Sequence, residues 1–248
     1  MTISAELTQA LSGKLFIPFI APPNGGKGTQ TTALLERFKD QLLRIDMGAL
    51  LRAAAKDESN PLGQQIREAQ NAGQLVTIDI VMDVLAEGMA KQALASQSVK
   101  GFLLDGFPRN MEQLSRLNML CEQVKATLSV GIFLNVPDEV IVERASGRVF
   151  HEETHQPYNL NIPALQPPHY DQATFDLESS VYYQREDDKA ETVQKRLTSF
   201  YNETRPVIDA LANEGTLLEV NGARDAADIT TELASVIEAK LSVACATS

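Results

Sequence analysis

The sequence predicts an α/β fold in which a parallel β-sheet is flanked by helices. Short apolar runs of strand length alternate with longer segments whose apolar residues recur at the helical spacing, which is typical of such sheets. A glycine-rich turn follows the first apolar run directly, as at many ligand-binding junctions between a strand and a helix. Two further stretches fall outside the alternation, so we expect insertions in a single core.

The first strand and helix surround this turn. Residues 15–21 form a continuous apolar run, which suits a strand buried on both faces. Residues 29–43 predict a helix, because leucines and Phe38 recur there every three or four positions. Together the two segments predict a strand, a tight turn and a helix.

The remaining core elements repeat the alternation. We predict strands at 101–105, 129–136 and 216–220, and helices at 111–124, 137–146 and 226–243. The helix at 137–146 begins with Pro137, and the first helical position tolerates proline because its N–H has no helical partner.

The two insertions differ in character. Residues 46–76 predict two short helices, 47–56 and 62–72, which a Ser-Asn-Pro turn joins. Residues 149–184 contain several prolines and aromatic residues but no helical period. Long irregular segments in compact enzymes commonly form lids or binding loops.

Charge and hydropathy exclude several classes of protein. The net charge of −11 argues against nucleic acid or an anionic membrane as the main partner. No apolar run approaches the roughly 20 residues needed to span a bilayer, and residues 1–14 lack the features of a targeting signal. We therefore expect no membrane partner and a cytoplasmic location.

Residues 21–29, Ala-Pro-Pro-Asn-Gly-Gly-Lys-Gly-Thr, are close to the phosphate-binding loop G-x-x-x-x-G-K-[ST]. Small residues let backbone N–H groups converge on phosphate oxygens, and Lys27 would reach the terminal phosphates. An alanine replaces the first glycine, and Gly28 fills the Ser/Thr position. Asn24 stands where glycine is common, yet asparagine accepts a positive φ. The alternative is a glycine-rich turn without function.

The strand predicted at 101–105 ends with Asp105, and Gly106-Phe107-Pro108-Arg109 follows it directly. An aspartate at the carboxyl end of a parallel strand lies where such sheets bind ligands, and it can hold Mg²⁺ or its waters. Arg109 would face the same crevice. Alternatively, Asp105 caps a helix and Arg109 is a solvated charge.

Residues 26–30 and 105–109 together resemble the adenylate kinase family. Further motifs follow the family order between about residues 15 and 240, at 50–54, 71–77, 136–139, 144, 147–148, 185–188, 192–197 and 220–222. The resemblance implies a P-loop nucleoside monophosphate kinase of the long-lid, zinc-free type, with a P-loop NTPase-like parallel sheet. It implies one domain over 1–248, whose parts are a core at 15–45, 77–146 and 189–245, an AMP-binding insertion at 46–76 and a lid at 147–188.

The implied reaction is reversible transfer of the γ-phosphoryl group of MgATP to AMP, which gives two ADP and serves cellular adenine nucleotide homeostasis. Phosphoryl transfer depends on positioning and charge neutralisation, and arginine binds phosphate oxygens in pairs. The resemblance assigns catalysis to Lys27, Arg109, Arg148, Arg185 and Arg196. It assigns ATP binding to Asn24, Gly25, Gly26, Lys27, Gly28, Thr29, Arg144, Arg148, Tyr158, Val220 and Arg224. It assigns AMP binding to Met47, Arg52, Gln74, Val76, Gly106, Arg109, Gln113, Arg185 and Arg196, and it places Mg²⁺ near Thr29 and Asp105, largely through water.

Three interpretations of the substrate remain open. Gln113 matches the family's adenine-reading glutamine, whereas Met47 replaces the usual threonine of the AMP pocket and Ala49 replaces an aspartate. A related kinase with GTP as donor or a pyrimidine monophosphate as acceptor is the first alternative. The second is a nucleotide-binding sensor that has lost catalysis, which Ala21 and Asn24 also motivate.

The resemblance also bears on metal and partners. Some family members hold a zinc in the lid with cysteines, but no cysteine lies between Cys121 and Cys245, so we expect no zinc. His-x-x-Thr at 151–154 and Asp-x-x-Thr at 171–174 match the zinc-free lid, in which hydrogen bonds replace the metal. The expected partners are ATP, AMP and ADP, and a monomer is the family expectation.

Overall fold

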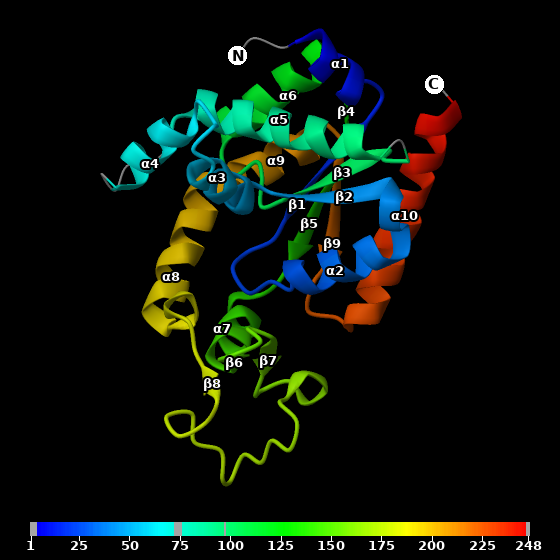
Figure 1. Ribbon diagram of the computed structural model, residues 1–248. Helices are drawn as coiled ribbons and strands as arrows, with labels where there is room; N and C mark the ends of the chain where they lie inside the picture. The colour runs from blue at the N-terminus through cyan, green and yellow to red at the C-terminus, as the bar shows by residue number, and fades with distance from the viewer. Residues whose placement is uncertain (1–3, 72–75, 97, 247–248) are drawn as a thin grey trace.

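A five-stranded path of parallel strands forms the centre of the molecule in the computed structural model, which describes residues 4–71, 76–96 and 98–246 (Figure 1). The strand order is β2 (Leu42–Asp46), β3 (Gly101–Asp105), β1 (Leu15–Ile20), β5 (Gly131–Asn135) and β9 (Leu217–Asn221), and β4 (Thr127–Leu128) pairs beside β1. Each of these pairings is parallel. The predicted α/β fold is therefore confirmed.

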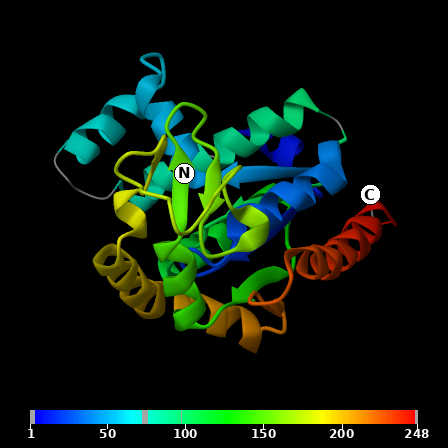
Figure 2. The same cartoon turned by 90° about the horizontal axis from the view of Figure 1, so that it is seen from below.

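Helices surround the sheet, as Figures 1 and 2 show. They are α1 (Ala5–Leu11), α2 (Lys27–Phe38), α3 (Met47–Lys56), α4 (Gly63–Asn71), α5 (Ile78–Ala95), α6 (Met111–Val124), α7 (Asp138–Ser146), α8 (Ala190–Ser199), α9 (Arg205–Asn213) and α10 (Ala226–Ala246). Short 3₁₀ turns are η1 (Lys39–Gln41), η2 (Pro163–Leu165) and η3 (Glu186–Asp188), and η4 (Phe200–Thr204) is a π-helical segment between α8 and α9. Within the described ranges, no helix has the length and apolar character needed to cross a membrane.

Side chains of the strands alternate between apolar clusters on opposite faces of the sheet. On β1, Phe16 packs in the cluster that includes α5 and α6, whereas Ile17 and Phe19 pack in the cluster that includes α2 and α10. Alternation with a period of two follows from strand geometry. Because helices cover both faces, both sets of positions are apolar, which explains the continuous apolar run in the sequence.

The predicted helix at 29–43 is wrong at both ends. The helix α2 begins at Lys27 and ends at Phe38, and Leu42–Asp46 is the edge strand β2, paired in register with β3. Leu42 and Ile45 are completely buried. Leu42 lies four positions after Phe38, so the helical period continued by coincidence into the strand. At a second boundary, Pro137 is the N-cap of α7 rather than its first helical residue.

Two segments leave the core on different sides. The predicted helices of the first insertion are present as α3 and α4, and they extend beside the sheet in Figure 1. The second contains a small antiparallel sheet in the order β7 (Pro157–Asn159), β6 (Arg148–His151) and β8 (Tyr182–Tyr183), which the sequence did not predict. This segment projects below the parallel sheet in Figure 1 and lies nearest the viewer in Figure 2.

Candidate active site

The glycine-rich turn joins β1 to α2 with the backbone expected of a phosphate-binding loop. Asn24 has φ 55° and Gly26 has φ 86°, so the predicted left-handed conformation at Asn24 is confirmed. A Cβ at Gly25 would lie 2.9 Å from the carbonyl oxygen of Pro22, which leaves no room for a side chain. Gly26 is the N-cap of α2 and has no capping side chain, so N–H groups of the first helical turn remain available for an anion.

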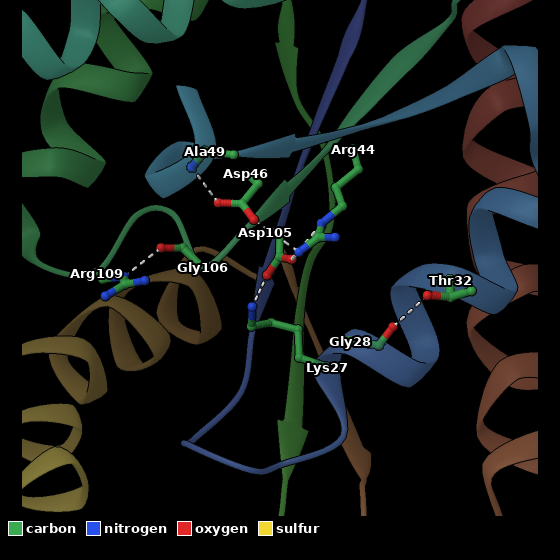
Figure 3. A network of polar contacts seen from close by, with 9 residues as sticks. All are labelled: Lys27, Gly28, Thr32, Arg44, Asp46, Ala49, Asp105, Gly106 and Arg109. Carbon is green, nitrogen blue, oxygen red and sulfur yellow. Dashed lines mark hydrogen bonds and ion pairs between the residues drawn. The ribbon is translucent and has the colours of Figure 1, made fainter. Parts of the chain in front are cut away.

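Lys27 and Asp105 meet at the carboxyl ends of β1 and β3 (Figure 3). The Lys27 ammonium contacts Oδ1 of Asp105, and Nε of Arg44, from β2, donates to Oδ2 of the same carboxylate at 2.7 Å. Asp105 is 6% exposed, so its charge is compensated by these two cations rather than by water. The structure thus brings two predicted site residues together and adds Arg44, which was not predicted.

Several positive charges crowd around Lys27. Burial and, after it, the charges of Arg109, Arg44 and Arg196 together lower the pKa of Lys27 to about 8, against the opposing effect of Asp46. Cations that destabilise one another in this way raise the affinity of a site for anions. The cluster therefore has the electrostatic character of a polyphosphate site.

Arg109 is positioned by the loop after β3. Its Nε donates to the carbonyl oxygen of Gly106 at 2.8 Å, and its backbone N–H donates to Oε1 of Gln113 at 2.7 Å. Thr204, in η4, donates to the Arg109 carbonyl at 2.9 Å. Gly106 has φ 68°, a conformation suited to glycine. The amide oxygen of Gln113 is thus engaged locally in this structure, and its reading of adenine stays a prediction.

Arg148 and Arg185 of the lid and Arg196 of α8 approach the loop to different extents. Nη1 of Arg148 donates to Oδ1 of Asn24 at 2.9 Å and lies 3.7 Å from Oδ1 of Asp188. The guanidinium of Arg185 lies over the ring of Phe150, 3.6 Å from its centroid. Arg196, on α8, lies 3.6 Å from Oδ2 of Asp187. Arg148 is the predicted lid cation that the structure brings into contact with the phosphate loop.

The other predicted ATP-binding residues lie in different places, and Arg144 is beside the glycine-rich loop. Nη2 of Arg144 donates to the carbonyl oxygen of Gly222 at 3.0 Å, and its Nη1 would lie 3.6 Å from a Cβ at Gly26. Partial burial of this guanidinium lowers the pKa of Arg144. Arg224 instead pairs with Glu232 of α10. Tyr158 lies in the lid strand β7 and contacts the Tyr182 ring, and Val220 is buried at 2% exposure.

Three of the predicted AMP-binding residues, Met47, Arg52 and Val76, lie on α3 or just before α5. Met47 is 8% exposed and packs in an apolar core cluster, and the half-buried Val76 packs against the same cluster. Arg52 is exposed on α3, and its Nη1 lies 3.0 Å from the position that a Cβ on Gly48 would occupy. Gln74 lies outside the described residues. Met47 therefore acts in the core packing here, and its contact with a nucleotide stays a prediction.

A divalent metal would need oxygen ligands at this site. The buried Asp105 carboxylate and the exposed Thr29 hydroxyl are hard oxygen donors on neighbouring elements, which suits Mg²⁺ bound largely through water. Among the residues whose side chains the structure describes, no group of three or more His, Cys, Asp or Glu residues gathers to hold a metal.

Each of the two predicted lid motifs forms its own turn. Backbone N–H groups of Glu153 and Thr154 donate to Nδ1 of His151 at 3.3 and 3.4 Å. The Thr174 hydroxyl donates to Oδ2 of Asp171 at 3.1 Å. Across the lid, all of which the structure describes, these turns are closed internally and no hydrogen bond joins one to the other.

The sequence analysis missed Arg44 and Asp46 at the carboxyl end of β2. The helix predicted at 29–43 included the first two residues of β2, so the strand was not recognised and neither charge was placed at the ligand-binding edge of the sheet. The available signal was Ile45, which is fully buried between the charged Arg44 and Asp46, an alternation typical of an edge strand. Recognising that strand would have placed Asp46 beside Asp105, its partner in the register.

Comparisons with known proteins cover most of the chain. A family model described as "Adenylate kinase" matches residues 19–216. An adenylate kinase of Desulfitobacterium hafniense is 34% identical over 221 residues, which are 88% of this chain and 96% of that relative. Adenylate kinases of Staphylococcus aureus and Staphylococcus epidermidis are each 30% identical over 216 residues, 87% of this chain and 95% of each relative. The family match therefore spans the phosphate loop, the first insertion and the lid.

Proposed function

Because this chain belongs to the adenylate kinase family, we propose that it catalyses reversible transfer of the γ-phosphoryl group of MgATP to AMP, with two ADP as products. Its cellular role would be adenine nucleotide homeostasis. We propose further that it acts as a monomer in the cytoplasm, without nucleic acid or membrane as a partner.

One observation carries the proposal: a half-buried lysine at the start of α2 lies among arginines from β2, from the loop after β3 and from α8. Lys27 has a pKa lowered to about 8 by burial and by Arg109, Arg44 and Arg196. Such repulsion is relieved when a polyanion enters. A phosphate loop alone binds one nucleotide, whereas cations from two sides suit two phosphate chains placed end to end.

Different residues of the site would bind the ATP phosphates, the AMP phosphate and the transferring group. We propose that the loop N–H groups and Lys27 hold the terminal phosphates of ATP, and that Arg52 and Arg109 hold the phosphate of AMP. Arg148, Arg185 and Arg196 would neutralise the charge that develops on the transferring group. Bound Mg²⁺ would be held near Asp105 and Thr29 and would supply further charge neutralisation.

Lid closure has a distinct role in this proposal. A phosphoryl group can pass to water as well as to AMP, so a site open to solvent would hydrolyse ATP. Arg148 is the lid arginine that reaches the loop, where its Nη1 donates to Oδ1 of Asn24. Closing the lid would bring cations and exclude water in the same movement.

The test is a coupled assay of ADP formation with purified full-length protein, MgATP and AMP. GTP replaces ATP, and UMP or CMP replaces AMP, in separate reactions. We expect the highest kcat/KM with ATP and AMP. Preference for GTP or a pyrimidine acceptor would replace the proposal with a related kinase, and ATP binding without turnover of any pair would identify a nucleotide sensor.

A further inference from the structure

One buried carboxylate, that of Asp105, serves two cations from different elements. Lys27 from α2 contacts Oδ1, and Arg44 from β2 donates its Nε–H to Oδ2 at 2.7 Å (Figure 3). The Asp105 side chain is only 3% exposed, whereas the side chains of Lys27 and Arg44 are 27% and 41% exposed. The carboxylate is therefore fixed in the interior, and its two partners approach it from the solvent side.

Arg44 also continues the network toward α3. Its Nη2 donates to Oδ2 of Asp46 at 3.2 Å, and Oδ1 of Asp46 accepts the backbone N–H of Ala49 at 2.9 Å as the N-cap of α3. The two carboxylates lie side by side because Asp46 and Asp105 are paired in the register of β2 and β3. Arg44 thus joins the phosphate-loop lysine, through Asp105, to the first turn of the helix that carries Arg52.

We propose that Arg44 is a positioning residue that keeps the Asp105 carboxylate compensated while Lys27 transfers its contact from Asp105 to the nucleotide phosphates. The inference rests on the proposed function. When Lys27 moves from Asp105 to the nucleotide phosphates, it no longer neutralises the Asp105 carboxylate. An unpaired buried carboxylate is strongly unfavourable. A second, permanent cation on Asp105 removes that obstacle.

The side-chain chemistry suits this division between the two cations. Lysine carries a compact charge on a flexible four-carbon stem and can change partners, whereas the planar fork of arginine binds two acceptors in fixed directions. Arg44 is held by two carboxylates, and Lys27 by one. Without Arg44, Lys27 would be the sole cation paired with Asp105 among the residues that the structure describes, and MgATP would compete with this ion pair for the lysine.

The experiment measures the dissociation constant of MgATP by titration calorimetry on the full chain, for Arg44→Gln in the wild-type and in the Asp105→Asn background. We expect Arg44→Gln to weaken binding about tenfold in the wild type and less than about twofold beside Asp105→Asn, because coupled residues are not additive. Arg116→Gln is the matched control, since Arg116 pairs with Asp79 outside the site, and it should leave the dissociation constant unchanged.

Unchanged MgATP affinity in Arg44→Gln would overturn the inference. An equal loss in both backgrounds would also overturn it, because Arg44 would then act on the nucleotide directly. Arg44→Lys, which keeps a charge near Asp105, should recover most of the affinity. If Arg44→Gln fails to fold, Arg44→Lys is the deciding variant. A tenfold loss of MgATP affinity in Arg44→Lys would then contradict charge compensation by Arg44. The binding measurement does not depend on turnover. If Arg44→Gln weakens MgATP binding as expected but the protein does not phosphorylate AMP, the proposed function is refuted and the inference about Arg44 is not.

Discussion

The core site and the lid are built in different ways. Asp105 ends the strand β3, which is buried and paired along its length with β1 and β2, and Lys27 from α2 and Arg44 from β2 both contact its carboxylate. The lid sheet consists of three short antiparallel strands, and only β6 contributes fully buried apolar residues, Val149 and Phe150, within the described lid. The core therefore fixes its charges by long-range packing, whereas the lid fixes them locally.

Aromatic rings take the place of an aliphatic core in the lid. Tyr182 contacts the rings of His151, Tyr158 and Phe175, with centroids 5.4 to 6.1 Å apart. Phe150 lies under the guanidinium of Arg185 and 4.9 Å from that of Arg148. Ring and cation–π contacts are each worth on the order of 1 kcal/mol, so the lid can keep its shape while its attachment to the core changes.

The difference between the core and the lid shows which part of the site is preorganised. Lys27 and Asp105 need no movement to meet, because the sheet register brings β1 and β3 together. The lid cation Arg148 is tied to the loop by one hydrogen bond to Asn24. Under the proposed function, breaking this contact would let Arg148 leave the loop as the lid opens.

Removing the core cation should have the largest effect. Lys27→Ala deletes the ammonium that the loop offers to the terminal phosphates, so we expect kcat to fall about 10²- to 10³-fold, as for other single electrostatic contacts in active sites. The melting temperature should stay close to that of the wild type. Lys91→Ala, an exposed change on α5, is the control. Near-normal activity in Lys27→Ala would refute the phosphate-loop assignment.

Two phenylalanines test the structural independence of the lid. Phe102 in β3 is fully buried and Phe150 in β6 is 2% exposed. Phe102→Ala should lower the free energy of unfolding by about 3–5 kcal/mol, because it leaves a cavity in the main core. Phe150→Ala should change it by less than about 1 kcal/mol yet make the lid more sensitive to protease, as expected of a locally stabilised unit. Equal losses on chemical denaturation would show that the lid and core unfold together.

The pH dependence should come from the core rather than from the lid. Lys27 has a pKa near 8 and must be protonated to hold phosphate, so kcat/KM for MgATP should fall above pH 8, by up to about tenfold per pH unit. A profile between about pH 6 and 10 at saturating AMP measures the decline. Lys27→Arg should remove it, and an unchanged decline in that variant would assign the titration elsewhere.

The link between the two regions should give the smallest effect. Asn24→Gly keeps the φ of 55° without strain but deletes the acceptor of Arg148. We expect KM for MgATP to rise about two- to fivefold, which is the worth of one hydrogen bond. Asn24→Ala should be more severe, because alanine is strained at positive φ. An effect of Asn24→Gly as large as that of Lys27→Ala would mean that the loop itself depends on Asn24.

Much of the core could be predicted because its signals are local. The apolar run of β1, the small residues of the loop and Asp105 at the end of β3 are each visible in a few consecutive residues. The prediction failed at β2, where a helical spacing persisted from Phe38 to Leu42 across a change of structure. It also failed at the lid strands, which are two to four residues long and carry too little pattern to detect.

Contiguous residues were enough to predict the fold class, the glycine-rich loop and the family resemblance that the comparisons confirm, because strand burial and loop composition are local properties of the chain. The spatial arrangement alone shows that Asp105 pairs with two cations, that Arg148 donates to Asn24, and that Met47 packs in the core. Those facts depend on the register between distant strands and on the approach of the lid. Contacts between residues that lie far apart in the chain leave no periodic trace in it.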